Sequence, residues 1–333
     1  MDITTVADDL IVAHRPGDGE VVRLDGLHPG SIHHVGNHEV QTLPRPSGEL
    51  LCRVGTVNDL HFGELECGKV DDDPRGPIQR VEPGEPPHPL IMNRAAVAEM
   101  ASADLAAVVV KGDLSSDGTD DEFAAFEACY RDAFADRLHV VRGNHDSYHG
   151  QLRYAGDDWI DLPGVSIALL DTVLSERTTG SITAAQLEWL DDRASAADRP
   201  VIVMGHHQQW VSGTRHADYF GLDPDSSDAL DAVTARRSNI VAYTAGHTHR
   251  HRVRPMSCGV PSVEVGCVKD FPGTWAEYRV YQGGIMQVVH RMSSPEALSW
   301  SERCRHLLAD FDIDYENYAL GRLEDRCFNI PLR

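Results

Sequence analysis

Leu51-Cys52-Arg53-Val54-Gly55-Thr56-Val57 is followed at once by Asn58-Asp59-Leu60-His61, and this junction decides how the chain folds. The first part is mostly apolar or β-branched, which predicts a buried strand, and the polar part then lies at its end. Five more runs of this kind are expected to be strands, at 105 to 111, 138 to 142, 165 to 170, 200 to 204 and 240 to 245. Helical stretches separate them, so the order predicts an α/β fold, in which functional side chains lie at strand ends.

Four of these other runs also end in a polar motif. The motifs are Gly112-Asp113, Gly143-Asn144-His145-Asp146, Gly205-His206-His207 and Gly246-His247-Thr248-His249. Carboxylates, amides and imidazoles are ligands that suit a pair of first-row divalent cations. Residues two apart on a strand share a face, so Asp59 and His61 are expected to converge on one ion. The same spacing is expected to point His247 and His249 into the site.

The composition is that of an ordinary globular protein with a strong acidic excess. The 333 residues are 41% hydrophobic, enough for one large core, and 52 acidic against 30 basic side chains give a formal charge of −22. That charge repels phosphate backbones and anionic lipid, so neither polymeric nucleic acid nor a membrane is expected as a partner. A small anionic ester can still enter a pocket whose local charge is set by bound metal.

Cysteine usage and hydropathy favour the cytoplasm. The seven cysteines form no CxxC pair and their number is odd, so free, packing thiols are expected. No apolar run reaches the roughly eighteen residues of a membrane span. Met1-Asp2-Ile3-Thr4 lacks the basic start and apolar stretch of a signal peptide.

Further elements are predicted from capping and turn signals. Thr119-Asp120-Asp121-Glu122 and Thr183-Ala184-Ala185-Gln186 fit the capping box and predict helix starts. Strands in a second sheet are expected near 260 to 265, 278 to 281 and 285 to 289, with Gly283-Gly284 as a hairpin turn. An amphipathic helix is expected from Glu296 to Asp310. The apolar tail from Cys327 to Leu332 docks either on its own core or on a second copy of the chain.

The ordered motifs DxH, GD, GNHD, GHH and GHxH resemble those of the calcineurin-like metallophosphoesterases, over roughly residues 51 to 290. The resemblance is greatest to the bacterial class III cyclic-nucleotide and glycerophosphodiester phosphodiesterases, because of the GHH segment and Gly180-Ser181-Ile182-Thr183 through Gln186-Leu187-Glu188-Trp189-Leu190. It implies a four-layer α/β/β/α sandwich of two mixed sheets flanked by helices. In this chain a small N-terminal β unit is expected in addition.

The resemblance also implies the roles of individual residues. The first ion would be held by Asp59, His61 and His249, the second by Asn144, His206 and His247, with Asp113 bridging them. His145 would donate a proton to the leaving group or hold the phosphate, and Asp146 would orient its ring. Substrate-binding roles are expected for Asn144 and His145. His207 has either a pocket role or a packing role.

Three parts of the chain are predicted. They are a small β unit at 1–50, a metallophosphoesterase domain at 51–293 with a loop insertion at 62–88, and a C-terminal helix and tail at 294–333. The insertion is either a solvated loop or a lid that shapes access to the metals. A homo-oligomer, in which a second subunit closes the pocket through this loop or the C-terminal helix, is one alternative.

Simple charge counting favours a diester substrate. Two divalent cations with two ionised aspartates leave +2, a bridging hydroxide as nucleophile leaves +1, and a phosphodiester monoanion then brings the site to neutrality. We therefore predict a dinuclear phosphodiesterase that uses two ions drawn from Fe, Mn, Zn or Co and acts on cyclic nucleotides or glycerophosphodiesters. The alternatives are a phosphomonoesterase, a non-catalytic metal-binding scaffold and, disfavoured by the charge, a nuclease.

Overall fold

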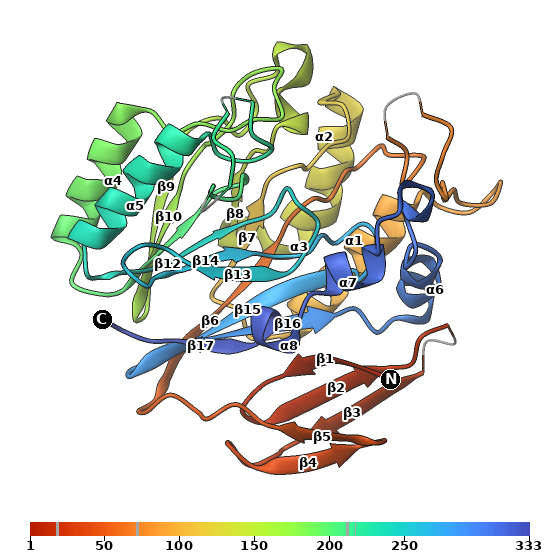
Figure 1. Ribbon diagram of the computed structural model, residues 1–333, viewed down its shortest axis with the longest axis horizontal. Helices are drawn as coiled ribbons and strands as arrows, with labels where there is room; N and C mark the ends of the chain where they lie inside the picture. The colour runs from red at the N-terminus through yellow and green to blue at the C-terminus, as the bar shows by residue number, and fades with distance from the viewer. Residues whose placement is uncertain (18–19, 71–72, 211–212, 217) are drawn as a thin grey trace.

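Two six-stranded mixed sheets face each other in the computed structural model, which describes residues 1–333 apart from 18–19, 71–72, 211–212 and 217 (Figure 1). The first sheet has the order β17 (Phe328–Ile330), β16 (Gly284–Arg291), β15 (Thr274–Tyr281), β6 (Leu50–Val57), β7 (Ala107–Lys111) and β8 (Leu138–Val141). The second has the order β13 (Arg252–Pro255), β14 (Pro261–Glu264), β12 (Ile240–Ala245), β11 (Val201–Met204), β10 (Val165–Leu169) and β9 (Asp158–Leu162). In the first sheet β6, β7 and β8 run parallel, and in the second β10, β11, β12 and β14 do, as β-branched strands covered on two faces do.

An apolar core fills the space between the sheets. Val54 and Val109 from the first sheet meet Ile167, Ile202 and Met204 from the second, and all five side chains are buried. Every second residue of these strands points to the opposite face, where helices cover it. The strands predicted from sequence at the six apolar runs are present, with ends that differ by at most two residues.

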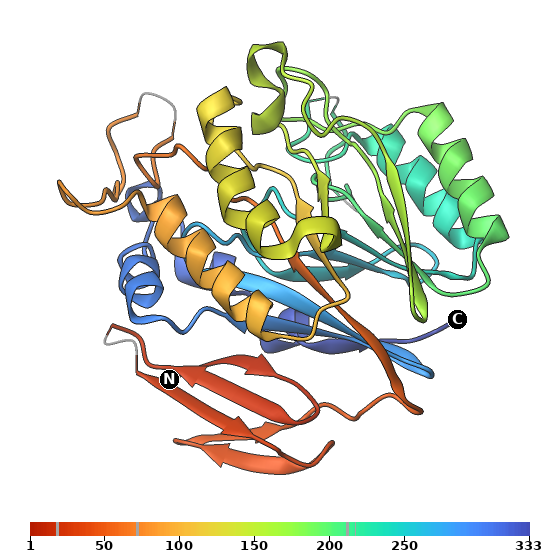
Figure 2. The ribbon, with the colours of Figure 1, turned by 180° about the vertical axis from the view of Figure 1, so that it is seen from behind.

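Helices cover the outer face of each sheet (Figure 2). The first sheet packs on α1 (His88–Ser102), α2 (Asp120–Phe126) with its continuations η1 (Glu127–Arg131), α3 (Asp132–Phe134) and η2 (Ala135–Arg137), and α6 (Pro295–Arg303). The second packs on α4 (Ala184–Ala196) and α5 (Pro224–Arg236). Both predicted capping boxes form, with Thr119 and Thr183 as N-caps. The four-layer α/β/β/α prediction is therefore confirmed.

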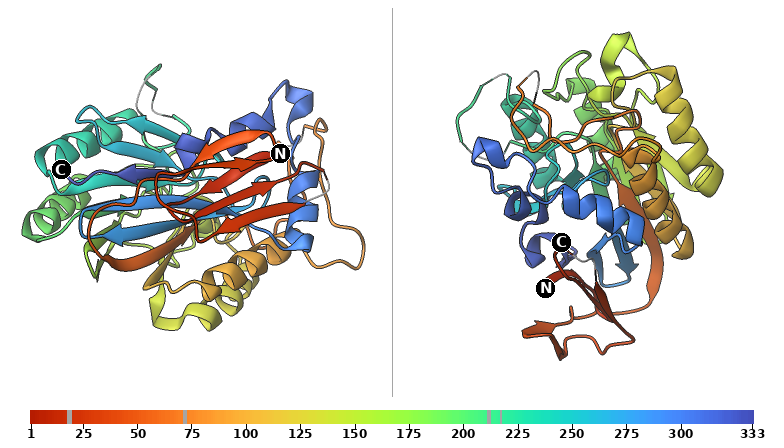
Figure 3. Two further views of the ribbon diagram at one scale, coloured as in Figure 1. Left: turned by 90° about the horizontal axis from the view of Figure 1, so that it is seen from below. Right: turned by 90° about the vertical axis from the view of Figure 1, so that its right-hand side faces the viewer.

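A small β unit precedes the sandwich and packs on the outer side of β16 (Figure 3). It consists of β1 (Asp2–Val6), β2 (Leu10–His14), β3 (Val21–Asp25) and the hairpin of β4 (Ile32–Val35) and β5 (His38–Gln41). Met286 and Val288, alternate residues of β16, are buried against it. The Thr5 hydroxyl donates a hydrogen bond to the Val289 carbonyl at 2.7 Å.

The two ends of the chain are tied together at this unit. After α7 (Tyr315–Leu320), the helix α8 (Leu323–Arg326) ends at the buried Arg326, whose guanidinium donates to the Ile3 and Thr4 carbonyls at 2.6 and 3.2 Å. It also donates to the Leu320 and Gly321 carbonyls at 2.6 and 2.9 Å. The tail then pairs with β16 as β17, which places it on the chain's own core.

Two local predictions for the C-terminal third need correction. The strands predicted after Gly246 do not all lie in the second sheet: β14 pairs parallel with β12 there, whereas β15 pairs antiparallel with β6 in the first sheet and β16 pairs with β15. The helix predicted from Glu296 to Asp310 ends at Arg303. The chain then passes through turns and η4 (Ala309–Phe311), with Leu308 at φ 63°. Among the described residues, no helix has the length and apolarity that crossing a membrane requires.

Candidate metal centre

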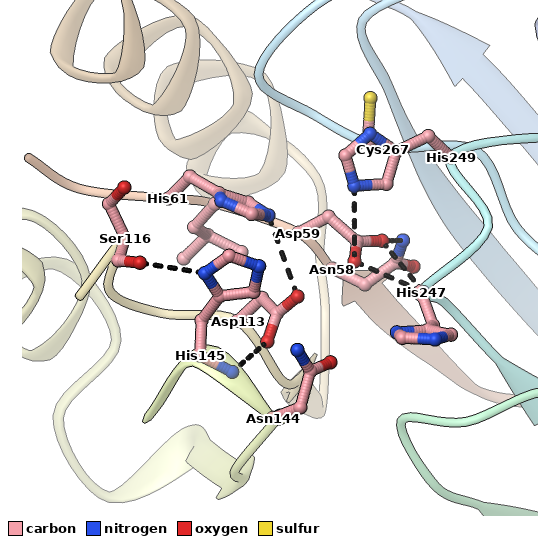
Figure 4. Close-up of polar contacts among 12 residues, drawn as sticks. Asn58, Asp59, His61, Asp113, Ser116, Asn144, His145, His247, His249 and Cys267 are labelled. Carbon is pink, nitrogen blue, oxygen red and sulfur yellow. Dashed lines mark hydrogen bonds and ion pairs between the residues drawn. The ribbon is translucent and has the colours of Figure 1, made fainter. Parts of the chain in front are cut away.

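Five polar motifs meet where strands of both sheets end, and Figure 4 labels residues of four of them, all except Gly205-His206-His207. The loops after β6, β7 and β8 bring Asp59, Asp113 and Asn144 from the first sheet. Those after β11 and β12 bring His206 and His247 from the second. Because the two sheets face each other, their parallel strands deliver these loops to one edge, where α/β folds place their sites.

The local backbone differs from the sequence-based expectation. Asp59, His61, Asp113, His247 and His249 all lie beyond their strands and have positive φ values, between 49° and 68°. The donor atoms of Asp59, His61 and His249 do converge, within 4.8 Å of one another, but the loop backbone and not the strand period brings them together. Left-handed backbone costs about 1–3 kcal/mol per non-glycine residue and persists where surrounding structure enforces it, commonly at functional sites.

A first group of donor atoms lies around Asp59. His249 Nε2 is 3.6 Å from Asp59 Oδ1, and His61 Nε2 is 3.5 Å from Asp113 Oδ2. The Asn58 side-chain amide donates to Asp59 and to the carbonyls of Val265 and Gly266, which fixes the carboxylate. The ligand atoms of Asp59, His61 and His249 all lie within 4.8 Å of one another, and these three side chains would hold one divalent cation.

A second group lies around His206. Its Nε2 is 3.1 Å from Asn144 Oδ1, 3.2 Å from Asp113 Oδ2 and 3.3 Å from His247 Nδ1. Its other nitrogen faces the Lys111 carbonyl at 2.9 Å and is therefore the protonated one, which leaves the Nε2 lone pair for a metal. Asp113 Oδ2 thus lies close to both groups.

Buried nitrogens that make no hydrogen bond support the fit of these groups to metal ions. Among the described residues, His61 Nε2 and His247 Nε2 are fully buried and make no hydrogen bond. Leaving such an atom unpaired costs about 1–3 kcal/mol, so native sites supply a partner. A cation is a partner that imidazole nitrogens, carboxylates and an amide oxygen can share.

The electrostatics of the site favour an ionised Asp113, neutral His61 and His247 rings, and a protonated His206 ring whose Nε2 proton a cation would replace. Burial, helped by the Lys269 ammonium, lowers the pKa of His61 to about 4. Burial and the neighbouring His207 and His206 rings lower the pKa of His247 well below its usual value. Although burial opposes the shift, the Asp113 carboxylate raises the pKa of His206 to about 9. The ionised Asp113 carboxylate is therefore stabilised by positive charge beside it.

His145 faces the centre from the loop after β8. Its backbone N–H donates to Asp113 Oδ1 at 3.0 Å, and its ring is 4.6 Å from that of His61. Ring Nδ1 lies 2.7 Å from the Ser116 carbonyl, so Nδ1 carries a proton and Nε2 is the nitrogen free to exchange one. These contacts are visible in Figure 4.

The prediction that Asp146 orients the His145 ring is wrong. The Asp146 carboxylate accepts hydrogen bonds from the backbone N–H groups of Leu114, Ser115 and Gly143 at 2.8 to 3.1 Å, and from the Ser115 hydroxyl at 2.7 Å. It thereby joins the loop after β7 to the loop after β8. The orienting contact comes instead from the Ser116 carbonyl.

His207 lies behind the centre, away from the cavity wall. Its ring is fully buried, 4.7 Å from the His247 ring, and Nδ1 is 2.7 Å from the Thr172 hydroxyl. Asn144 and His145 line the neighbouring cavity, and His207 does not. Among the described residues that line the cavity, His207 is therefore not one that substrate would contact, and the structure favours the packing alternative.

Three charged residues beside the centre were missed at the sequence level. Glu64 lies 3.3 Å from His61 Nδ1, and Asp270 lies 3.5 Å from His249 Nδ1. Lys269 joins them, 2.6 Å from Glu64 and 3.7 Å from Asp270. Carboxylates in this position fix the orientation of metal-binding imidazoles and raise their basicity. Only the spacing of His61 and Glu64 offered a signal, because Asp270 reaches the site from after β14.

Three further histidines, His88, His149 and His251, make other contacts. His88 is buried against Trp300, with ring centroids 4.3 Å apart, and His251 contacts the Thr274 hydroxyl. His149 is exposed and lies 3.2 Å from Asp117. None of the three adds a ligand to either group of donor atoms described above.

A cavity of about 560 Å³ opens over the donor atoms. Asp113, Asn144 and His145 form its floor, together with three of the histidines described above, and Phe220 and Tyr318 stand at its sides; the three are His61, His247 and His249. A volume of this size accommodates a small organic ester.

Comparisons with known proteins agree with this architecture. A family model described as Calcineurin-like phosphoesterase matches residues 52–251, more than half of the chain. The chain belongs to the calcineurin-like phosphoesterase family. The description names phosphoesters as the compounds on which this family acts.

Two curated relatives of this family member are both named probable cyclic nucleotide phosphodiesterase. One, from Synechococcus sp. (strain ATCC 27144 / PCC 6301 / SAUG 1402/1), is 26% identical over 149 residues, 43% of this chain and 57% of the relative. The other, from Fibrobacter succinogenes (strain ATCC 19169 / S85), is 21% identical over 211 residues, 59% of this chain and 72% of the relative. The chain thus spans just over half the length of the Synechococcus relative.

A solved structure shares the fold. The crystal structure of a dimetal phosphatase from Danio rerio superposes on 73% of this chain and 97% of its own, with a TM-score of 0.59 and 17% sequence identity. At this identity the likeness shows a common fold.

Proposed function

We propose that this protein is a dinuclear metal-dependent phosphodiesterase for small phosphodiesters, cyclic nucleotides or glycerophosphodiesters. The observation that carries the proposal is the position of Asp113 Oδ2. It lies 3.5 Å from His61 Nε2 and 3.2 Å from His206 Nε2, so one oxygen borders both groups of donor atoms. A carboxylate shared in this way is suited to bridging two cations.

Seven side chains would hold the ions. They are Asp59, His61, Asp113, Asn144, His206, His247 and His249. The chemistry that bound cations supply here is Lewis acidity, which activates water as a nucleophile and offsets the negative charge of the ester oxygens. Metal binding would then offset the free-energy cost of the left-handed backbone at these loops, because this backbone places the ligands.

His145 is proposed to hold the phosphate and to protonate the leaving oxygen. The Ser116 carbonyl fixes its Nδ1 as a donor, so a second proton on the ring must reside on Nε2. Because His145 lines the cavity, that proton is available to an ester bound there. No other imidazole among the described cavity residues lies outside the two groups of donor atoms.

Local charge supports a diester over a monoester. Glu64 and Asp270 contribute two negative charges beside the centre and Lys269 one positive charge, a net of −1. Lys111 lies beneath the site, and burial lowers its pKa to about 7, so its positive charge is partial. A monoanionic diester is repelled less by this surround than a dianionic monoester. The names of both curated relatives are consistent with a diester.

A phosphomonoesterase is the second candidate. The solved structure of similar fold is named a dimetal phosphatase, which keeps that activity open for this fold. A non-catalytic scaffold is a weaker candidate, because the buried, unpaired His61 and His247 nitrogens and the cavity-lining His145 are features of a working site.

Removal of Asp113 tests the proposal. Asp113→Ala takes away the oxygen that borders both groups, so hydrolysis of bis-p-nitrophenyl phosphate is expected to fall below detection, with loss of metal by elemental analysis. Asn144→Ala should behave alike. Asp117→Ala is the matched control, because Asp117 is exposed and pairs with His149 outside the cavity.

The same preparations separate the candidates. A parent protein that turns over bis-p-nitrophenyl phosphate faster than p-nitrophenyl phosphate at equal metal content supports the diesterase, and the reverse order supports the phosphomonoesterase. Normal turnover and metal content in Asp113→Ala would overturn the site assignment.

A further inference from the structure

The cavity over the metal centre has a polar floor and an apolar wall. The wall comes from the segment after α6, residues 307–318, in which Leu307, Leu308, Ile313, Tyr315 and Tyr318 all line the cavity. This segment lies outside the part of the chain that matches the family model. We call it the C-terminal wall.

Two apolar side chains face the C-terminal wall from other parts of the fold. Val70 comes from the loop after β6, and Phe220 from the segment between β11 and α5. The Phe220 ring stacks on His247 with centroids 4.1 Å apart. Phe220, Ile313 and Val70 are 52%, 41% and 39% exposed, unusually high for large apolar residues that gather around one opening.

Hydrogen bonds hold the wall in register with the centre. The Tyr315 hydroxyl donates to Asp270 Oδ1 at 2.9 Å, and Asp270 contacts His249. The Tyr318 hydroxyl donates to the Thr248 carbonyl at 2.9 Å. A methyl group at Gly68 would come within 2.5 Å of Leu307, so the loop after β6 approaches the wall closely. The wall is therefore a fixed surface of the pocket.

The described cavity residues offer no spare positive charge for a second anionic group. Lys269 lies 2.6 Å from Glu64, and Lys69 lies 3.4 Å from Glu66. An ester that carries a further phosphate or carboxylate would place it against apolar side chains or these carboxylates. Desolvating an unpaired charge there is strongly unfavourable.

We propose that the C-terminal wall, with Val70 and Phe220, binds an uncharged apolar or aromatic group of the phosphoester. This inference rests on the proposed function and narrows it: esters of flat or apolar groups, nucleobases included, are preferred over glycerol esters, whose hydroxyls find few partners on this surface. Aromatic and aliphatic surfaces that stack on such a group give preference through the apolar area they remove from water.

Binding of symmetric, slowly hydrolysed diesters tests the wall without regard to which ester group leaves. The dissociation constants of dimethyl, dibenzyl and bis(4-carboxybenzyl) phosphate are measured by calorimetry on the metal-loaded protein. Dibenzyl phosphate is expected to bind at least about tenfold more tightly than dimethyl phosphate, a typical preference of an apolar pocket. The carboxylated compound is expected to bind more weakly than dibenzyl phosphate.

Two variants of the apolar cavity lining, called the wall variants below, and one control locate the effect. Ile313→Ser and, independently, Phe220→Ser are expected to reduce the dibenzyl-to-dimethyl ratio several-fold. Both side chains are part-exposed, so either protein should fold. Ile32→Ser is the control, because Ile32 is 58% exposed on β4, outside the cavity lining, and its ratio should equal the parent's.

Failure of the wall and failure of the proposed function give different results. Equal binding of dibenzyl and dimethyl phosphate, or an unchanged ratio in both wall variants, overturns the wall proposal even when bis-p-nitrophenyl phosphate is hydrolysed. A dimer that Ile313→Ser dissociates, with no benzyl preference in the parent, overturns it in favour of a second copy on the wall. If dibenzyl phosphate binds preferentially but no phosphoester is hydrolysed, the proposed function is overturned instead.

Discussion

The metal centre and the C-terminal wall of its cavity are built in opposite ways. Every proposed ligand comes from a loop at a strand end within residues 52–251, the part of the chain that matches the family model. The wall comes from residues 307–318, where turns and short helices present apolar side chains. The difference teaches that reaction chemistry and ester preference rest on separate segments, so mutation should be able to change one without the other.

The largest expected effect that separates the two regions is at His145. His145→Ala removes the proposed acid, so turnover of alkyl esters should fall by about 10² to 10⁴, with a smaller loss for p-nitrophenyl esters whose leaving group needs no proton. Metal content should stay at the parent's level, as measured by elemental analysis. His149→Ala, which removes an exposed ring four residues later, should leave turnover unchanged. Loss of both ions from His145→Ala would reassign His145 to metal binding.

A smaller effect is expected where the wall meets the centre. Asp270→Asn keeps the shape of the side chain but removes the charge that faces His249 Nδ1, so metal affinity or turnover should fall about 10- to 100-fold. Metal titration followed by calorimetry measures the affinity directly. Asp73→Asn is a control of the same chemistry, because Asp73 pairs with Arg75 in the loop after β6. An affinity equal to the parent's would show that Asp270 supports the fold alone.

The smallest effect sharpens the boundary between the regions. Tyr315→Phe keeps the ring that lines the cavity and removes the hydroxyl that donates to Asp270. A hydrogen bond to a charged group contributes about 1.5–3 kcal/mol, part of which should appear as a several-fold weaker metal affinity. The dibenzyl-to-dimethyl binding ratio should not change. A change in that ratio without a change in metal affinity would show that the Tyr315 hydroxyl contributes to ester binding and not to metal binding.

The fold was largely predictable because its signals are local. Apolar, β-branched runs such as Val54 to Val57 mark buried strands, and capping boxes at Thr119 and Thr183 mark helix starts. The pairing of β15 with β6 was not predictable, because more than two hundred residues separate the strands. No local pattern specifies which of two apolar sheets a late strand will join.

The candidate site was predictable as a set of residues but not as a geometry. The order of motifs singled out all seven proposed ligands, and the structure brings their donor atoms together. The left-handed backbone of Asp59 and His247 left no trace in the sequence, because neither residue is glycine. The roles of Ser116 and Asp270 were equally hidden, since a carbonyl and a carboxylate reach the rings only through tertiary contacts.

Arg326 gives the C-terminal wall a support at the far end of the molecule. One buried guanidinium is shared between the carbonyls of Ile3 and Thr4 in β1 and those of Leu320 and Gly321, at the end of the helix that carries Tyr315 and Tyr318. If β1 left its place, this charge would lose two of these four acceptors while still enclosed by protein, which is energetically unfavourable. These hydrogen bonds link the first strand and the last helices into a single cooperative element. Fraying at one terminus is therefore opposed by its contacts with the other.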